Sequence, residues 1–239
     1  MKKLEPKTRG WKLSATMSCL AMWAAVSVAV GKDLTPDRID GDGDQTLALT
    51  VRVFIYAPVP SSEMSAAERV ASKIFQKAGL EMTWLDCPMT GTPATLNPAC
   101  SAFMTLAEIH LNIMPDFPKI PQVEESAMGF ALTVPPPDRG QFASISYGQV
   151  RRQLLHASQL TLDQLLGRGM AHEIGHLLLG TNSHAPTGLM SAQWSEQKMK
   201  LAAFLQFDFS KDQAARIRGD VRARMRQQES QQMAQRAPI

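Results

Sequence analysis

Cysteine and aromatic residues are scarce in this chain, and their scarcity argues against several functions. The 239 residues include three cysteines and no Gly-x-Ser-x-Gly run, so a cysteine or serine hydrolase has little support. Aromatic residues make up 6% of the chain, which leaves few platforms on which nucleotide bases could stack. Histidine is rare too, yet three of the five histidines fall between positions 172 and 184. That cluster bears most directly on function.

Basic residues gather ahead of an apolar run at the N-terminus. Five Lys or Arg residues and one Glu precede the run from Met17 to Val30, which ends among small residues. This pattern predicts a signal peptide over residues 1–30, with an uncleaved membrane anchor as the alternative. Without that leader the formal charge falls from +3 to −1. We therefore expect a secreted or periplasmic protein that has no nucleic-acid partner and touches a membrane only through an uncleaved leader.

Cys87 and Cys100 are the cysteines that remain after the leader. In an exported protein, an isolated pair is most simply a disulfide, here closing a loop rich in Pro and Thr. Two buried free thiols are the alternative if the leader does not direct export.

Changes in composition mark three regions beyond the leader. Residues 31–46 are rich in Asp and predict a flexible acidic lead-in. Residues 47–228 suffice for one catalytic domain with a substantial core, and we expect a monomer. Residues 229–239 include part of a Gln-rich stretch and predict a disordered tail.

Hydrophobic patterning predicts an α+β domain. Apolar residues recur at helical spacing over residues 62–78, which predicts a helix. Residues 149–156 are expected to form another helix or the approach to one. The strand-like segments are 46–57, 80–86, 107–113, 129–134 and 142–147. A strand followed by a helix and another strand implies a parallel pair, so we expect a mixed sheet of four or five strands.

A further helix is predicted over residues 162–179. Thr161 and Gln164 form a capping-box pattern at its start, and Gly180 is suited to end it because glycine tolerates left-handed backbone angles. Apolar residues recur at intervals of three and four, which leaves His172 and His176 on an adjacent stripe. We expect that stripe to border a cleft.

His172, Glu173, His176 and His184 have the chemistry of a catalytic zinc site. Histidines four residues apart project from one face of a helix, so their imidazoles can converge on one metal ion. Glu173 lies beside this pair, where it would act as general base on a metal-bound water. His184 lies on the chain that returns after Gly180, and a catalytic zinc takes three protein ligands. The spacing thus predicts one Zn²⁺ held by three histidines.

This segment resembles the zincin metallopeptidases, and the third histidine after a glycine makes it similar to the metzincin branch. The metzincin pattern places its glycine three residues, and its third histidine six residues, after the second histidine. Here Gly180 is four and His184 eight residues after His176, so the chain resembles a variant of that site. The resemblance implies a metzincin-like domain with a backing helix, an active-site helix and a C-terminal helix. It also implies a methionine turn beneath the metal, and Met190 fits that role.

Other residues are weaker candidates for the site. Glu196 is the second candidate for third ligand, since thermolysin-like zincins take a downstream glutamate, but its polar and cationic surroundings favour His184. His110 is expected on the polar face of a strand and His156 beside the active-site helix, neither as a ligand. Tyr147 is considered as an oxyanion donor, although a half-buried place at a strand end is favoured.

A capping-box pattern at Ser210 and Gln213 predicts a final helix. Arginines cluster along it at positions 216, 218, 222, 224 and 226. Such a series is usually a solvated face, and its functional alternative is docking to an acidic peptide or an anionic lipid.

The function that these patterns favour is hydrolysis of a peptide or protein substrate by an exported zinc endopeptidase. The alternative, from a different class, is a zincin-like module that binds zinc without cleaving and serves in adhesion or envelope assembly. Glu173 favours the enzyme, because it supplies the general base that hydrolysis needs.

Overall fold

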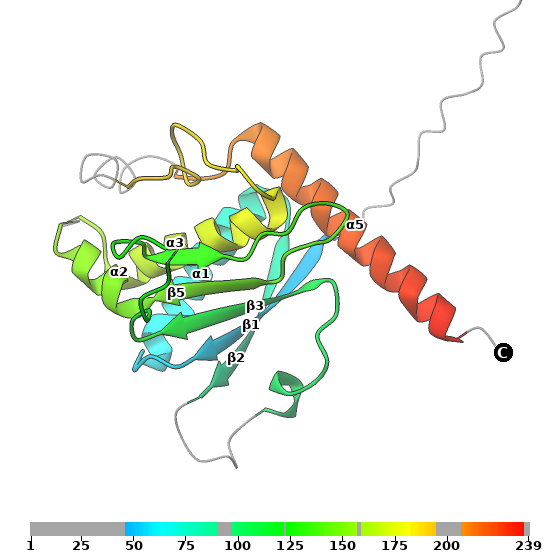
Figure 1. Cartoon of the computed structure of the whole chain (residues 1–239), viewed down its shortest axis with the longest axis horizontal. Helices are drawn as coiled ribbons and strands as arrows, with labels where there is room; N and C mark the ends of the chain where they lie inside the picture. The colour runs from blue at the N-terminus through cyan, green and yellow to red at the C-terminus, as the bar shows by residue number, and fades with distance from the viewer. Residues whose placement is uncertain (1–45, 90–96, 122, 157–158, 195–206, 237–239) are drawn as a thin grey trace, which may run out of the picture. The chain divides into compact units, whose positions relative to one another are not determined.

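Five strands form one mixed sheet in the computed structural model of the chain (Figure 1). The structure describes residues 46–89, 97–121, 123–156, 159–194 and 207–236. These residues belong to one unit, Asp44–Ile239, and share a hydrophobic core. The predicted signal peptide, the acidic lead-in up to residue 45, and Glu196 lie outside the described residues.

The strands are β1 (Ala48–Ile55), β2 (Glu81–Pro88), β3 (Glu108–Met114), β4 (Gly129–Ala131) and β5 (Phe142–Ser146). Their order in the sheet is β2-β1-β3-β5-β4. β1 pairs in parallel with β2 and β3, and β3 pairs in parallel with β5. β4 pairs antiparallel with β5 at one edge. The predicted mixed sheet is confirmed.

One face of the sheet is buried beneath two helices. Ile109 and Ile113 of β3 are fully buried, whereas His110 between them points to the opposite face, as the two-residue period of a strand requires. The helices are α1 (Ser61–Lys77) and α3 (Leu162–Leu179), which pack against each other and against the sheet (Figure 1). The helices predicted over residues 62–78 and 162–179 are therefore present.

The ends of α3 lie where the sequence predicts them. At its start, the backbone N–H of Thr161 donates to the side chain of Gln164 at 3.3 Å, as a capping box requires. At its end, Gly180 has a φ of +80°, in the left-handed region that glycine tolerates. A shorter helix, α2 (Tyr147–Leu154), begins directly after β5.

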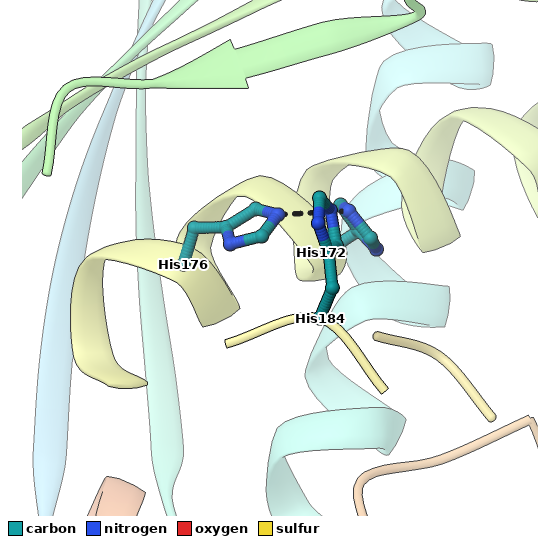
Figure 2. A group of neighbouring side chains, drawn as sticks. All are labelled: His172, His176 and His184. Atoms are coloured by element: carbon teal, nitrogen blue, oxygen red, sulfur yellow. Dashed lines mark hydrogen bonds between the residues drawn. The ribbon is translucent and has the colours of Figure 1, made fainter. Parts of the chain in front are cut away.

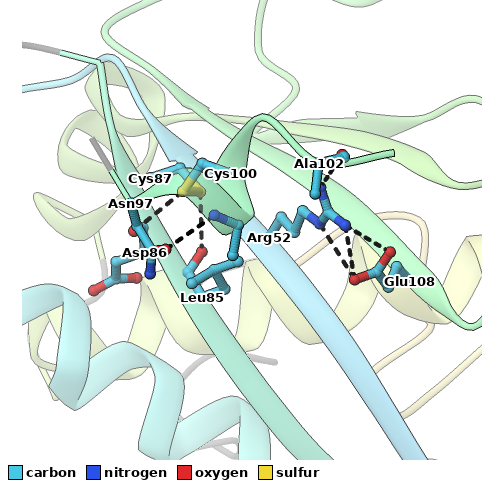
Figure 3. The surroundings of a disulfide bond; sticks show 9 residues. Arg52, Leu85, Asp86, Cys87, Asn97, Cys100, Ala102 and Glu108 are labelled. Atoms are coloured by element: carbon cyan, nitrogen blue, oxygen red, sulfur yellow. Dashed lines mark hydrogen bonds and ion pairs between the residues drawn. A yellow bond between two sulfur atoms is a disulfide. The ribbon is translucent and has the colours of Figure 1, made fainter. Parts of the chain in front are cut away.

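Cys87 and Cys100 form the predicted disulfide (Figure 3). It joins β2 to a 3₁₀ turn, η2 (Pro98–Cys100). Nearby, the buried guanidinium of Arg52 lies 2.8 Å from the carboxylate of Glu108 and donates to two backbone carbonyl oxygens between η2 and β3 (Figure 3). The disulfide and this ion pair together fasten the connection from β2 to β3.

The C-terminal helix, α5 (Lys211–Arg236), extends further than predicted. The Ser210 hydroxyl accepts from the backbone N–H of Gln213 at 3.2 Å, so the predicted cap is confirmed. The helix then continues through residues 229–236, where a disordered tail was expected. That expectation is wrong for these residues, because Gln, Ala, Met and Arg are good helix formers and no Gly or Pro interrupts them before Pro238. Neither α5 nor any other described helix is long and apolar enough to cross a membrane.

Three arginines of α5 donate hydrogen bonds to backbone carbonyl oxygens of other segments. Arg224 is fully buried, and its guanidinium binds the carboxylate of Asp220 at 2.6 Å and the backbone carbonyl of Gly140 at 2.9 Å. Arg216 and Arg218 donate to carbonyl oxygens at the C-terminal ends of α3 and α1. They satisfy acceptors that a helix end leaves unpaired. The expectation of a solvated arginine face is therefore wrong for Arg224, whereas Arg216 is exposed and Arg218 half-buried. A count of charges does not show which carbonyl oxygens they contact.

Candidate metal centre

Two histidines of α3 present their imidazoles to the same point. The Nε2 atoms of His172 and His176 lie 3.0 Å apart (Figure 2). Their four-residue spacing stacks them one turn apart on one face of the helix. His172 is buried and His176 is half-buried. The predicted two-residue clamp is thus formed by local helical geometry.

His184 reaches this point from the segment that follows α3. Gly180 and Asn182 have left-handed φ angles of +80° and +57°, so the chain reverses direction within a few residues. His184 is exposed, and its ring centroid lies 4.6 Å from that of His176. One possible ligand atom from each of the three histidines lies within 4.8 Å of the others. The structure therefore brings the three predicted ligands together (Figure 2).

Hydrogen bonds hold the Nδ1 atoms of the two helical histidines. Nδ1 of His172 lies 2.8 Å from the backbone carbonyl oxygen of Leu189. Because a carbonyl only accepts, this nitrogen carries the proton and Nε2 keeps a free lone pair. Nδ1 of His176 lies 2.7 Å from the hydroxyl of Ser183. Contacts of this kind orient histidine ligands in metal sites.

Burial keeps both helical histidines neutral. Loss of solvent, together with the charge of neighbouring histidines, lowers the pKa of His172 to about 4 and that of His176 to about 3. The bond to Leu189 offsets only part of this change at His172. Neutral imidazole is the form that binds a metal. Three imidazoles on one point suit zinc, which takes nitrogen ligands and leaves a fourth position open at catalytic sites.

Glu173 lies beside the histidines, against the edge strand β4. Its side chain is buried, and a Cβ at Gly129 would lie 2.6 Å from its Cγ and 2.7 Å from its Oε1. Glycine at position 129 therefore leaves the space that this carboxyl occupies. Burial raises the pKa of Glu173 to about 8. A cation held by the neighbouring imidazoles would favour the ionised form, so this carboxyl is placed to exchange a proton near neutral pH.

A turn in contact with the histidines carries Met190. Gly188 has a φ of +79°, and its carbonyl accepts from the N–H of Ser191 at 3.2 Å. Between them, Leu189 supplies the carbonyl that holds His172. Met190 is fully buried, and the turn therefore joins the three-histidine cluster to the core of the domain.

A cleft of about 820 Å³ opens over these residues. β4 and the segment before it line one part, and α3 with residues 180–184 and 191–194 line another. Trp194 is one of the residues that line the cleft. Its ring meets that of His172 edge-on at a centroid distance of 5.5 Å, and its Nε1 donates to the carbonyl of Leu189 at 3.3 Å. The volume is typical of a site that binds a substrate.

The weaker candidates do not line this cleft in the described part of the chain. His110 stacks on an aromatic ring of β1, on the outer face of the sheet. Tyr147 is buried at the start of α2 rather than at a strand end, and its hydroxyl donates to Glu63 at 3.0 Å. His156 is exposed beyond α2. Glu196, the alternative ligand, is outside the described residues.

Sequence reasoning missed three residues that contact the helical histidines. These are Ser183, Leu189 through its backbone carbonyl, and Trp194. A serine or leucine near a histidine motif carries no signal by itself, because its contact depends on how the returning chain bends. The closeness of Ser183 to His184 in the sequence was the one available hint.

Comparisons with known proteins give likenesses of structure but not of sequence. No protein-family model matches the sequence, and no curated protein matches it either. Among solved structures, the chain is similar to archaemetzincin from Methanopyrus kandleri, with 13% sequence identity and a TM-score of 0.46. The alignment covers 74% of this chain and 98% of the archaemetzincin chain. At this level of similarity, the function has to be inferred from the residues of the site.

Proposed function

We propose that this chain is an exported zinc-dependent metallopeptidase with a variant of the metzincin site. The observation that carries the proposal is the convergence of His172, His176 and His184, with Glu173 beside them on the wall of one cleft. Three imidazoles would hold the zinc and leave one position free. Met190 follows Leu189, whose carbonyl accepts the hydrogen bond from His172. Met190 would form the floor of the site.

The chain's own residues supply the proton transfers of hydrolysis. Bound zinc contributes Lewis acidity, which polarises a peptide carbonyl and brings the pKa of water toward 7. Glu173 accepts a proton from the attacking water and returns it to the leaving amine. Its burial supports this role, because a raised pKa stabilises the protonated carboxyl between the two transfers.

The cleft supports a peptide as substrate. β4 is the last strand in the sheet order, and among the described residues no strand pairs with its side away from β5, where an extended peptide could add. None of the described residues that line the cleft is Lys or Arg. Without a fixed cation, the described lining does not favour the C-terminal carboxylate that a carboxypeptidase must hold. This favours cleavage within a chain, and thus an endopeptidase.

Two features support export. The disulfide between Cys87 and Cys100 is of a kind that persists in oxidising compartments. The basic and apolar N-terminus has the pattern of a signal peptide. We propose a secreted or periplasmic monomer that acts on peptides or proteins.

Cleavage of an unfolded protein with and without a chelator tests this function. We expect activity that the chelator removes and added zinc restores. Glu173→Gln should lower kcat/KM by about 100- to 10,000-fold, because it removes a general base, while zinc content stays unchanged. Glu81→Gln is the control and should keep wild-type activity, since Glu81 is an exposed carboxylate of β2 that does not line the cleft.

The same experiment separates the enzyme from the alternative function. A protein that contains one zinc per chain but shows no chelator-sensitive cleavage would favour a zincin-like binding module in adhesion or envelope assembly. Full activity in Glu173→Gln would remove Glu173 from the mechanism.

A further inference from the structure

We propose that Ser183 is a positioning residue of the metal centre, whose hydroxyl holds the His176 imidazole with Nε2 facing the metal. This inference rests on the proposed function, because it concerns the same three histidines. It assigns a role to a side chain that the ligand pattern of the sequence does not include.

The position of Ser183 is set by the bend after α3. Asn182, directly before it, has a φ of +57°, and Gly180 has a φ of +80°. Asparagine and glycine adopt such angles more readily than other residues. The bend buries Ser183, which is 5% exposed, and brings its Oγ to 2.7 Å from Nδ1 of His176. The next residue, His184, is directed to the same centre, so one short segment supplies both a ligand and the support of another ligand.

The contact with Ser183 fixes what His176 can offer to a metal. A neutral imidazole carries one proton, and the nitrogen that binds the metal must be the other one. Nε2 of His176 faces Nε2 of His172 at 3.0 Å, and a metal bound there would take the lone pair of each. In that state Nδ1 of His176 holds the proton and donates it to the Ser183 hydroxyl at 2.7 Å. His172 has the equivalent support from a backbone carbonyl. His176 depends instead on a side chain, which substitution can remove.

Zinc affinity of serine variants measures this role. We expect Ser183→Ala to bind zinc about 10- to 100-fold more weakly than wild type in competition with a chromophoric chelator, as loss of such partners does elsewhere. Ser183→Thr keeps the hydroxyl and should recover most of the affinity. Ser144→Ala is the matched control, because Ser144 is also buried and its hydroxyl accepts one hydrogen bond, from Asn112 at 3.2 Å, away from the cleft. Its zinc affinity should equal that of wild type.

A second measurement separates positioning from general stability. In the zinc-loaded wild type, proton and nitrogen NMR should show a slowly exchanging Nδ1 proton on His176, and Ser183→Ala should lose this signal while the His172 signal remains. Thermal unfolding of the metal-free variants is recorded beside it. Equal losses of stability and affinity in Ser183→Ala and Ser144→Ala would mark a merely structural role and overturn the inference.

The outcomes distinguish this inference from the proposed function. Wild-type affinity in Ser183→Ala, with the His176 signal retained, would overturn the role of Ser183 and leave the zinc site intact. A wild-type protein that takes up no zinc would overturn the proposed function, and the role of Ser183 with it.

Discussion

The sulfur of Met190 lies against the backbone of Gly175, the residue before His176. A Cβ at position 175 would be 2.8 Å from this sulfur and 2.8 Å from a ring carbon of Phe209. Glycine therefore allows the turn that carries Met190 to touch the helix that carries the histidines. The same turn holds His172 through the carbonyl of Leu189, so this contact couples the packing of the core to the orientation of a ligand.

Gly175→Ala should disturb this contact. We expect the free energy of unfolding to fall by about 1–3 kcal/mol, because an added methyl group overpacks a filled core. Zinc affinity should also fall, since the turn that holds His172 has to move. Gly219→Ala is the control: a Cβ at this exposed position of α5 meets nothing within 4 Å, and it should stabilise the fold by about 0.5–1 kcal/mol. Urea unfolding of the two metal-free variants measures these changes in the free energy of unfolding. Unchanged stability in Gly175→Ala would contradict the close contact.

Gly129→Ala should impair catalysis without removing the metal. The new Cβ would meet the Glu173 carboxyl and displace it, since its three nearest atoms all belong to Glu173. We expect kcat/KM to fall by about 100-fold, as for an ångström-scale misplacement of a reacting group. Zinc content by elemental analysis should equal that of wild type. Full activity in this variant would mean that the carboxyl does not act from the position beside β4.

The stability of the fold should depend on pH through Glu68 of α1. Burial, followed by the hydrogen bond and charge of Asp86, raises the pKa of Glu68 from 4.5 to about 8. The folded state therefore keeps a proton that the unfolded chain releases, and this contribution is complete below about pH 4.5 and lost as the pH rises through about 8.

Glu68→Gln tests that dependence because its amide does not titrate. Metal-free wild type should lose stability between about pH 5 and pH 8, and the variant should lose less over the same interval. Urea unfolding at several pH values gives the slope of the free energy of unfolding against pH for each protein. The same slope in wild type and variant would show that the pKa of Glu68 is the same in the folded and unfolded chains.

Arg224→Ala should be strongly destabilising. The buried guanidinium binds Asp220 and the backbone carbonyls of Leu106, Gly140 and Leu177. Its removal takes this donor from the three carbonyls and leaves Asp220 with its ion pair to Arg139. We expect a loss of about 3–5 kcal/mol, as when one partner of a buried ion pair is removed. Arg226→Ala, two residues further along the same helix, is exposed and should change stability by no more than about 0.5 kcal/mol. Similar small effects in both variants would contradict the burial of Arg224.

Local patterns in the sequence predicted the elements that carry the site. The period of apolar residues, the capping box at Thr161 and the glycine at 180 together placed α3 at its observed bounds. Because helix geometry alone sets the distance between residues four apart, the convergence of His172 and His176 followed from their spacing. The sheet was predictable for the same reason, since alternation along a strand is a local property.

Contacts that depend on tertiary packing could not be predicted in this way. The charge pattern of α5 suggested a solvated face, yet Arg224 is buried, and three backbone carbonyls from distant segments accept from its guanidinium. The hydrogen bond from His176 to Ser183 depends on the left-handed angle of Asn182, which no periodic pattern specifies. Such contacts join residues whose separation in the sequence carries no information about their distance in space.

Zinc content is the decisive measurement for the three-histidine centre. Elemental analysis and affinity titration of wild type should give one zinc per chain, with much weaker binding in His184→Ala and unchanged binding in Glu196→Ala. A wild-type protein that remains free of zinc, or a His184→Ala variant that binds zinc as wild type does while Glu196→Ala does not, would contradict the assignment of His172, His176 and His184 as the ligands.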